Sequence, residues 1–270
     1  MCIRDRFART YDIPTILTQR TVRAEHRLIS RLKYRSYDKI AAVSQSVESG
    51  LLRQRTPRQK IELIYDGVNL ADYAEPYARS ELREALGIPH DARIIGNVGR
   101  FNLKKGQLDL LETFIELSAQ YPDLHLLLFG NGEMLDELLD FIDNNGLTGR
   151  AHIAGFKSDL PKWYASLDLL VHTAIQDALS VVIMEAMANA VPVIAYNRDG
   201  INEIIQHAKT GLLVQPGEKD QLEDAISRVL DDQSMYKRMS KAARTVCRRE
   251  FNSDRMSRQY AEIYSSLVEG

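Results

Sequence analysis

The sequence predicts an α/β protein whose larger part is a doubly wound parallel sheet. The 270-residue chain is 44% hydrophobic and 27% charged, which is typical of a globular protein. From Arg93 onward, short apolar runs alternate with stretches whose apolar residues recur at helical spacing. The apolar runs are continuous rather than interrupted at every second residue, as expected for parallel strands covered by helices on both faces.

The chain begins with a smaller and less complete α/β unit. Apolar runs predict strands at 14–18, 39–43 and 61–64. A basic helix is expected at 23–35, and a second helix follows Ser44 and runs to about residue 53. Two or three strands and two helices are too few to bury a doubly wound sheet. Residues 1–65 are therefore predicted to be an incomplete domain. The main domain is placed at 66–252 and a closing helix at 253–270.

The main domain follows in regular order. Asn145-Gly146 suits a helix end, and Ser253 is the expected N-cap of the last helix. Strands are expected at 94–99, 124–129, 151–154, 168–172, 191–195 and 211–214. Helices are expected at 107–120, 133–145, 160–166, 181–189 and 201–207, and then successively at 219–230, 234–250 and 253–267.

Composition excludes several protein classes. No apolar run reaches the roughly 18–20 residues that span a bilayer, and residues 1–6 lack the apolar core of a signal peptide. Cys2 and Cys247 form neither a disulfide framework nor a zinc set, which fits a reducing cytoplasm. Asp-x-Asp, His-Glu-x-x-His, Cys-x-x-Cys and phosphate-loop motifs are absent from the sequence. We therefore expect no metal and no cofactor.

The charge is distributed unevenly. Residues 1–60 contain 14 Lys or Arg against 5 Asp or Glu, a local charge of +9, whereas the whole chain carries −2. Such asymmetry favours two surfaces with different partners. The basic region would face anionic lipid headgroups or an anionic substrate. A solvated helical face explains the charge equally simply, and no nucleic-acid partner is expected.

Candidate site residues lie in loops that follow strands, because ligands of open α/β sheets bind beyond the carboxyl ends of the strands. After the strand at 94–99, the chain places Gly99, Arg100 and Lys105 just before a helix. A guanidinium, an ammonium and a helix N-terminus together suit a diphosphate. The alternative is an exposed basic loop.

A second loop carries two glycines, Gly130 and Gly132, that would let the backbone approach a ligand. The alternative is a tight turn between strand and helix. Leu135 stands where the dinucleotide fingerprint requires a third glycine, which disfavours an NAD-dependent oxidoreductase.

The third loop is the most informative. Glu185 is expected in an early turn of an otherwise apolar helix, where a carboxylate is costly to bury without partners. Ribose hydroxyls would be suitable partners, and the alternative is a solvent-facing glutamate. Asp177 lies eight positions earlier and can reach the same crevice, although taken alone it is an ordinary loop residue.

These residues resemble those of the GT-B-fold glycosyltransferases of family 4, a retaining group that uses nucleotide-sugar donors. The resemblance runs from about Pro14 to the C-terminus and is strongest between Ile94 and Gly217. It rests on five motifs in family order: Ile64-Tyr65-Asp66-Gly67-Val68-Asn69, Gly99-Arg100 with Lys105-Gly106, Asp177-x7-Glu185 with Ala186-Met187-Ala188, Val191-Pro192-Val193-Ile194, and Thr210 through Gly217.

The resemblance implies a GT-B fold with a Rossmann-like, nucleotide-sugar-binding C-terminal domain and a partial acceptor-side domain before it. It assigns the ribose to Glu185, the departing diphosphate to Arg100 and Lys105 in place of a metal ion, and the nucleobase to Phe156 and Lys157. The implied catalytic residues are Arg100, Lys105, Asp177 and Glu185. The implied donor-binding residues also include Gly99, Gly130, Gly132, Phe156, Lys157 and, through backbone N–H groups, Ser180 and Val181.

Two departures from the family pattern follow. The first acid of the Glu-x7-Glu motif is Asp177, one methylene shorter, so the identity of the sugar does not carry over. The chain also starts partway through the family's N-terminal domain. The resemblance therefore implies an additional half-domain upstream in a full-length version, and residues 1–6 are expected not to be native sequence.

By this resemblance the chain is a retaining glycosyltransferase. It would move a sugar from a nucleotide-diphosphate donor to a glycan or lipid-linked acceptor, in cell-surface polysaccharide or lipopolysaccharide synthesis. The expected location is the cytoplasm, at the inner face of the membrane, with the basic N-terminal region as a peripheral membrane contact. The alternative is a non-catalytic donor-binding fragment or pseudoenzyme.

Overall fold

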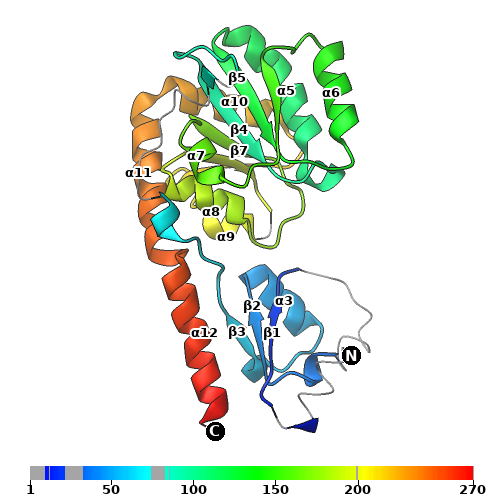
Figure 1. Ribbon diagram of the computed structural model, residues 1–270, viewed down its shortest axis with the longest axis vertical. Helices are drawn as coiled ribbons and strands as arrows, with labels where there is room; N and C mark the ends of the chain where they lie inside the picture. The colour runs from blue at the N-terminus through cyan, green and yellow to red at the C-terminus, as the bar shows by residue number, and fades with distance from the viewer. Residues whose placement is uncertain are drawn as a thin grey trace.

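The computed structural model describes residues 10–11, 13–21, 33–73, 83–84, 86–198 and 200–269, in which the strands form two parallel sheets (Figure 1). The smaller sheet has the order β1-β2-β3 and the larger has the order β6-β5-β4-β7-β8-β9. The predicted α/β class with a doubly wound parallel sheet is confirmed. The strands are β1 (Ile16–Gln19), β2 (Lys39–Ala42), β3 (Ile61–Leu63), β4 (Arg93–Val98), β5 (Leu124–Phe129), β6 (Ala151–Gly155), β7 (Leu169–His172), β8 (Val193–Tyr196) and β9 (Gly211–Val214).

Helices cover both faces of the larger sheet. Neighbouring strand residues belong to different cores: Leu126 and Leu169 pack with α5, α6 and α10, whereas Leu127 and Leu170 pack with α8 and α11. This division explains why the strands are apolar without interruption. The helices are α3 (Gln45–Arg53), α5 (Gln107–Gln120), α6 (Leu135–Asn144), α7 (Leu160–Tyr164), α8 (Val181–Ala188), α9 (Ile201–Ile204), α10 (Lys219–Asp231), α11 (Gln233–Glu250) and α12 (Ser253–Val268).

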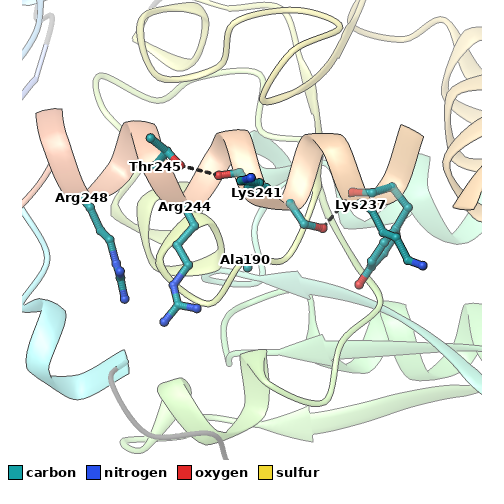
Figure 2. Close-up of a pocket in the computed structure, with 8 residues that line it drawn as sticks. Ala190, Lys237, Lys241, Arg244, Thr245 and Arg248 are labelled. Atoms are coloured by element: carbon teal, nitrogen blue, oxygen red, sulfur yellow. Dashed lines mark hydrogen bonds between the residues drawn. The ribbon is translucent and has the colours of Figure 1, made fainter. Parts of the chain in front are cut away.

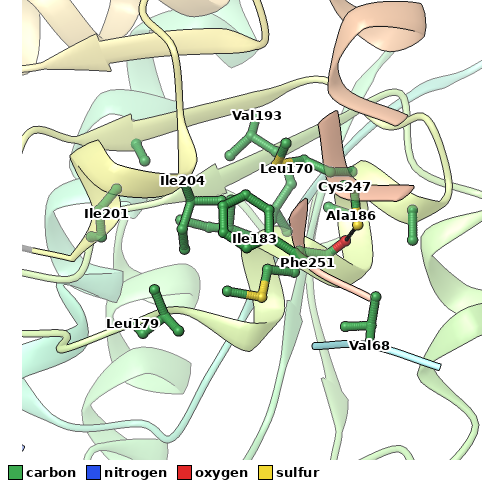
Figure 3. Packing of buried hydrophobic residues seen from close by; sticks show 14 of the residues in the cluster. Val68, Leu170, Leu179, Ile183, Ala186, Val193, Ile201, Ile204, Cys247 and Phe251 are labelled. Atoms are coloured by element: carbon green, nitrogen blue, oxygen red, sulfur yellow. Dashed lines mark hydrogen bonds between the residues drawn. The ribbon is translucent and has the colours of Figure 1, made fainter. Parts of the chain in front are cut away.

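Helix α8 is held on several sides by apolar side chains. Ile183 and Ala186 pack among residues of the larger sheet, α9 and α11 (Figure 3). The Cys247 thiol of α11 donates a hydrogen bond to the Met184 carbonyl oxygen at 3.3 Å. Burial raises the pKa of Cys247 to about 12, so this thiol stays protonated and serves packing. The N-terminus of α8 is thereby fixed at the end of the sheet.

Helix ends differ from the sequence prediction in places. The N-cap of α12 is Asn252 rather than Ser253, because the Asn252 side chain accepts a hydrogen bond from the Arg255 N–H at 2.8 Å. Helix α9 ends at Ile204 because Ile205 is already extended. The basic helix predicted at 23–35 lies outside the described residues except for 33–35, and residues 1–6 lie outside them entirely.

The last helix leaves the larger sheet and packs against the smaller one (Figure 1). Ile263 of α12 lies in a small buried cluster with Ala41 and Ile64. The Tyr260 hydroxyl is 2.9 Å from the Thr18 hydroxyl at the end of β1. Within the described residues, no helix combines the length and apolarity needed to cross a membrane.

Glu203 of α9 joins the two sheets at a second place. Its carboxylate accepts hydrogen bonds from the backbone N–H groups of Gln45 and Ser46, at 2.7 and 2.9 Å, and from the Tyr65 hydroxyl at 3.1 Å. It therefore supplements Ser44, the N-cap of α3, with a negative charge at the positive end of that helix. The contact links α3 of the smaller unit directly to α9 of the larger.

Candidate functional site

The larger sheet reverses its strand order between β4 and β7, which is the position where open α/β sheets bind ligands. Two hydrogen bonds join the loops that follow these two strands. The Ile175 N–H donates to the Lys104 carbonyl oxygen at 2.9 Å, and the Thr173 hydroxyl donates to the Lys105 carbonyl oxygen at 3.0 Å. Gly106 has a φ of +64°, and a Cβ there would lie 2.4 Å from the Thr173 carbonyl oxygen. Only glycine allows this close approach.

The first charged cluster joins those two loops. The Lys105 ammonium donates to the Asp177 carboxylate at 2.9 Å, and His172 Nε2 lies 3.2 Å from the same oxygen. Ser180 Oγ is 3.3 Å from His172 Nε2. Since a carboxylate only accepts, His172 must carry its hydrogen on Nε2. The Ser180 hydroxyl then accepts, and its own hydrogen stays free to donate to a ligand.

Neighbouring charges keep Asp177 ionised. Burial alone would raise the pKa of Asp177, but the hydrogen bond from His172 and the Lys105 ammonium outweigh it and lower that pKa. Burial lowers the pKa of His172, so the imidazole is neutral at pH 7. The Lys105 side chain is still 24% exposed and the Asp177 side chain 17% exposed. An ion pair is therefore presented at the edge of the crevice.

Glu185 belongs to a separate cluster. The buried Tyr164 hydroxyl donates to the Glu185 carboxylate at 3.0 Å, and the Tyr73 side chain also hydrogen-bonds it. Tyr73 comes from the 3₁₀ turn Leu70–Tyr73, in the segment that joins the two sheets. Burial raises the pKa of Glu185, and the two tyrosine hydrogen bonds offset this only in part. Glu185 is thus a half-buried acid held by neutral donors.

A cavity of about 420 Å³ opens beside the loop that follows β4. Arg100 and Phe156 line it from opposite loops, and the Phe156 side chain is 78% exposed. Arg100 forms only a surface ion pair with Glu133, at 3.2 Å, so it can turn toward a ligand. The other lining residues are Val98, Gly99, Phe129, Gly130, Asn131, Lys157 and Leu160.

The two glycines after β5 have a structural reason of their own. Gly130 has a φ of +146°, and a Cβ there would lie 1.9 Å from the Gly99 carbonyl oxygen. A Cβ on Gly132 would lie 2.2 Å from the Phe101 carbonyl oxygen. The tight-turn alternative therefore accounts for both. Gly130 also lines the cavity, whereas Gly132 does not.

The N-terminus of α8 lacks a side-chain cap. Its N-cap, Ser180, makes no hydrogen bond to the first turn, because its hydroxyl is turned to His172. Val181, the first residue of α8, is partly exposed. The first N–H groups of this helix, which carry its partial positive charge, are therefore free of side-chain acceptors among the described residues.

The structure thus places the predicted residues in three groups, two of which adjoin. Gly99, Arg100, Gly130, Phe156 and Lys157 share the cavity. Lys105, Asp177 and Ser180 belong to the charged cluster, and Glu185 lies with two tyrosines. A Cβ on Gly99 would lie 3.6 Å from Lys105 Cδ, so the cavity and the charged cluster adjoin.

Sequence reasoning did not identify three residues of this site. These residues are His172, Tyr164 and Tyr73. Tyr164 and Glu185 are 21 positions apart, and Tyr73 is far more distant in sequence. A buried glutamate on an apolar helix does signal that some donors must exist, but it does not say which ones.

Comparison with known proteins identifies the family and the fold. The sequence profile of the family Glycosyl transferases group 1 matches residues 78–246. N-acetyl-alpha-D-glucosaminyl L-malate synthase of Bacillus anthracis is 26% identical over 231 residues, which cover 86% of this chain and 60% of that protein. The lipopolysaccharide core biosynthesis glycosyltransferase LpsE of Rhizobium meliloti is 28% identical over 184 residues, which cover 68% of this chain and 53% of that protein.

The chain spans between half and three fifths of the length of these two relatives. The crystal structure of Anabaena Alr3699/HepE in complex with UDP superposes with a TM-score of 0.89 at 24% identity. That match covers 97% of this chain and 75% of the other, and it shows a common fold. The family profile covers well over half of the chain. The chain therefore belongs to the glycosyl transferases group 1 family and has a GT-B-type fold.

Proposed function

We propose that this chain binds a nucleotide-diphosphate sugar and serves its transfer, with retention, to a glycan or lipid-linked acceptor. The observation that carries the proposal is the order of groups at the switch point. A partly apolar cavity and a pair of cations adjoin there, a half-buried carboxylate follows on α8, and these groups complement a base, a diphosphate and a ribose. A relative of the same fold has been crystallised with UDP, which supports a donor of this class.

In this proposal the diphosphate lies against Arg100, Lys105 and the first turn of α8. Both side chains are cations, and with the uncapped helix N-terminus they stabilise negative charge as it develops on the leaving group. The Ser180 hydroxyl has a hydrogen to donate at the same place. These groups replace a divalent cation, and we propose that transfer needs none. A chelator such as EDTA should leave the rate unchanged.

We propose that Glu185 accepts hydrogen bonds from the ribose hydroxyls. Its half-buried carboxylate already accepts hydrogen bonds from Tyr164 and Tyr73, and its partial exposure leaves room for further donors. Asp177, ionised and next to Lys105, would face the donor sugar. Attack by the acceptor on the leaving-group face gives retention without a protein nucleophile, so none is assigned.

The acceptor side is proposed on less direct support. One relative carries a name from lipopolysaccharide core biosynthesis, which favours a cell-surface glycan or its lipid-linked precursor as the acceptor. Enzymes of such pathways that use soluble nucleotide sugars work in the cytoplasm, and we place this chain there, at the inner face of the membrane. Much of the basic N-terminal region lies outside the described residues, so its role as a membrane contact stays a prediction.

Calorimetric titration of the chain with UDP, GDP and ADP tests the donor site. We expect at least one of them to bind, and Arg100→Ala and Glu185→Ala each to weaken that binding about tenfold or more. Arg228→Ala, which removes an exposed arginine of α10, is the matched control and should bind as wild type. Absence of binding by all three nucleotides, or equal binding by every variant, would contradict the assignment.

A second candidate function is favoured by the extent of the family match. The family profile matches residues 78–246, which contain the donor-site groups, so donor binding without transfer is the second function. A transfer assay with a radiolabelled donor separates the two functions. Sugar transfer by this chain supports the enzyme, whereas nucleotide binding without transfer supports the donor-binding unit.

A further inference from the structure

Helix α11 carries a second concentration of positive charge, away from the donor site. It contains six Lys or Arg and one Glu, although the chain as a whole carries −2. Four of these cations, Lys237, Lys241, Arg244 and Arg248, line a groove of about 360 Å³ together with Ala190 and Tyr236 (Figure 2). Ala190 follows the C-terminal end of α8, whereas the donor site lies at the N-terminal end of that helix.

The four cations form a straight row. They are separated by four, three and four residues, so their directions around the helix axis fall within about 60° and the row is about 16 Å long. Figure 2 shows Arg244 and Arg248 extending from the same side of α11, toward the side where Ala190 lies. The opposite side of α11 packs into the core through Met239, Ala243, Val246 and Cys247.

These cations lack acidic partners. Among the described residues, no carboxylate lies within salt-bridge distance of any of the four, although Arg249 and Arg255 both pair with Glu250. The Arg244 Nε is buried and has no hydrogen-bond acceptor in the described part of the chain. Uncompensated like charges in a row repel one another, and a surface built this way gains stability when an anionic partner arrives.

The form of the row indicates what kind of partner fits. Cations spread over about 16 Å cannot converge on one phosphate group, so the partner must present several anionic groups in an extended array. α11 contains no large exposed apolar side chain, which disfavours a protein interface with an apolar centre. A single half-buried ring, Tyr236, lines the groove, so it lacks the stacking platform of single-stranded nucleic-acid sites.

We infer that the basic face of α11 docks on a bilayer containing anionic lipids. A plane of headgroup phosphates complements a straight row of long-stemmed cations, of which Lys237, Lys241 and Arg248 are exposed and Arg244 is half-buried, and the groove accommodates a headgroup beside Arg244. Figure 1 shows α11 and α12 running along one edge of the molecule, past the larger and then the smaller sheet. A bilayer at this edge therefore lies alongside both parts of the protein. This contact is independent of the proposed donor chemistry.

Vesicle sedimentation tests the inference. Binding of the chain to phosphatidylcholine vesicles with and without phosphatidylglycerol is measured at about 0.1 M salt, where charges about 10 Å apart still interact. We expect binding only with the anionic lipid. The double variant Lys241→Gln/Arg244→Gln should lower the partition coefficient about 25-fold, at about fivefold for each lost charge. The charge-preserving variant Lys241→Arg/Arg244→Lys should bind as wild type.

A matched control separates the effect of this face on vesicle binding from the effect of net charge. Lys209→Gln/Arg228→Gln removes two exposed positive charges elsewhere and should change the partition coefficient by less than about threefold. Equal losses in both double variants, or no preference of wild type for anionic vesicles, would overturn the inference. So would a Lys241→Gln/Arg244→Gln variant that loses binding to soluble polyphosphate but keeps its vesicle binding, because the partner would then be a polyanionic chain.

Discussion

Asp177 and Glu185 stand eight positions apart on one loop-and-helix segment, but their surroundings shift their pKa values in opposite directions. Asp177 lies between a cation and an imidazole N–H, which together overcome the effect of burial and lower its pKa. Glu185 receives hydrogen bonds from neutral tyrosines alone, and burial keeps its pKa raised. Two carboxylates on one loop-and-helix segment are thereby prepared for different tasks.

The difference fits the two roles that we propose for these acids. A carboxylate with its own counter-ion is ionised before any ligand arrives, so Asp177 and Lys105 can orient a polar ligand without a change of protonation. A carboxylate without a counter-ion gains most from new hydrogen-bond donors, and ribose hydroxyls supply them. The folded state gains stability from Asp177 above the ordinary pKa of aspartate and loses it as the pH falls through the lowered value. For Glu185 ionisation costs stability, so the cost appears as the pH rises through its raised pKa.

Removing the counter-ion of Asp177 should give the largest effect. Lys105→Met eliminates a diphosphate contact and leaves the Asp177 carboxylate facing the same anion, so UDP binding should weaken about 100-fold. Calorimetry measures this loss. Adding Asp177→Asn to Lys105→Met should recover part of the affinity and the melting temperature.

Lys104→Met is the matched control for that variant, because Lys104 is the adjacent exposed lysine. It should bind UDP nearly as wild type. If Lys104→Met and Lys105→Met weaken binding equally, the loop acts through its overall charge and the ion pair with Asp177 has no particular role.

Glu185→Gln tests the ribose assignment and should have the next largest effect. Loss of a charged acceptor should weaken UDP binding about 10- to 30-fold, equivalent to about 1.4–2 kcal/mol. The same substitution should leave the weaker binding of 2′,3′-dideoxy-UDP unchanged, since that nucleotide has no hydroxyls to offer. An equal loss with both nucleotides would place the ribose elsewhere.

Tyr164→Phe should shift the pH dependence of UDP binding. Binding requires ionised Glu185, so affinity should fall as the pH is lowered through its raised pKa. The Tyr164 hydrogen bond lowers that pKa. Without it, the loss of UDP affinity on acidification should begin at a higher pH, and the affinity at pH 8 should change little. Tyr196→Phe removes a comparable hydrogen bond, to Asp109 at 2.9 Å, and should leave the pH dependence of UDP binding unchanged.

Glu203→Gln should give the smallest effect, because it lies outside the donor site. It removes the charge that caps α3 across the two sheets, a contribution of about 1 kcal/mol. The melting temperature should fall by about 2–4 °C, with UDP affinity unchanged. Glu218→Gln, an exposed N-cap whose side chain makes no capping hydrogen bond, should leave the melting temperature unaltered.

Much of the fold was predictable because its signals are local. The helix Gln107–Gln120 and the strands Leu124–Phe129 and Gly211–Val214 match their predicted bounds, because the helix has apolar residues at helical spacing and the strands are short continuous apolar runs. Bounds were less accurate where a neighbour decided them, as at Asn252, whose side chain rather than that of Ser253 caps α12.

The site was predictable as a location but not as a network. Parallel topology alone places the loops of Lys105 and Asp177 at one edge, although they are 72 positions apart. The direct ion pair, the role of His172 and the two tyrosines on Glu185 depend on side-chain packing between distant elements. No periodicity or motif in the sequence carries that information.

The most direct test of this account is a titration of the carboxyl groups themselves. With 13C-labelled Asp and Glu side chains, NMR spectra across the acidic range follow each carboxylate, and Asp177→Asn and Glu185→Gln assign the two signals. We predict that Asp177 titrates below the ordinary range of aspartate and Glu185 above that of glutamate. Two ordinary values, or the reverse order, would contradict the division of roles between these acids.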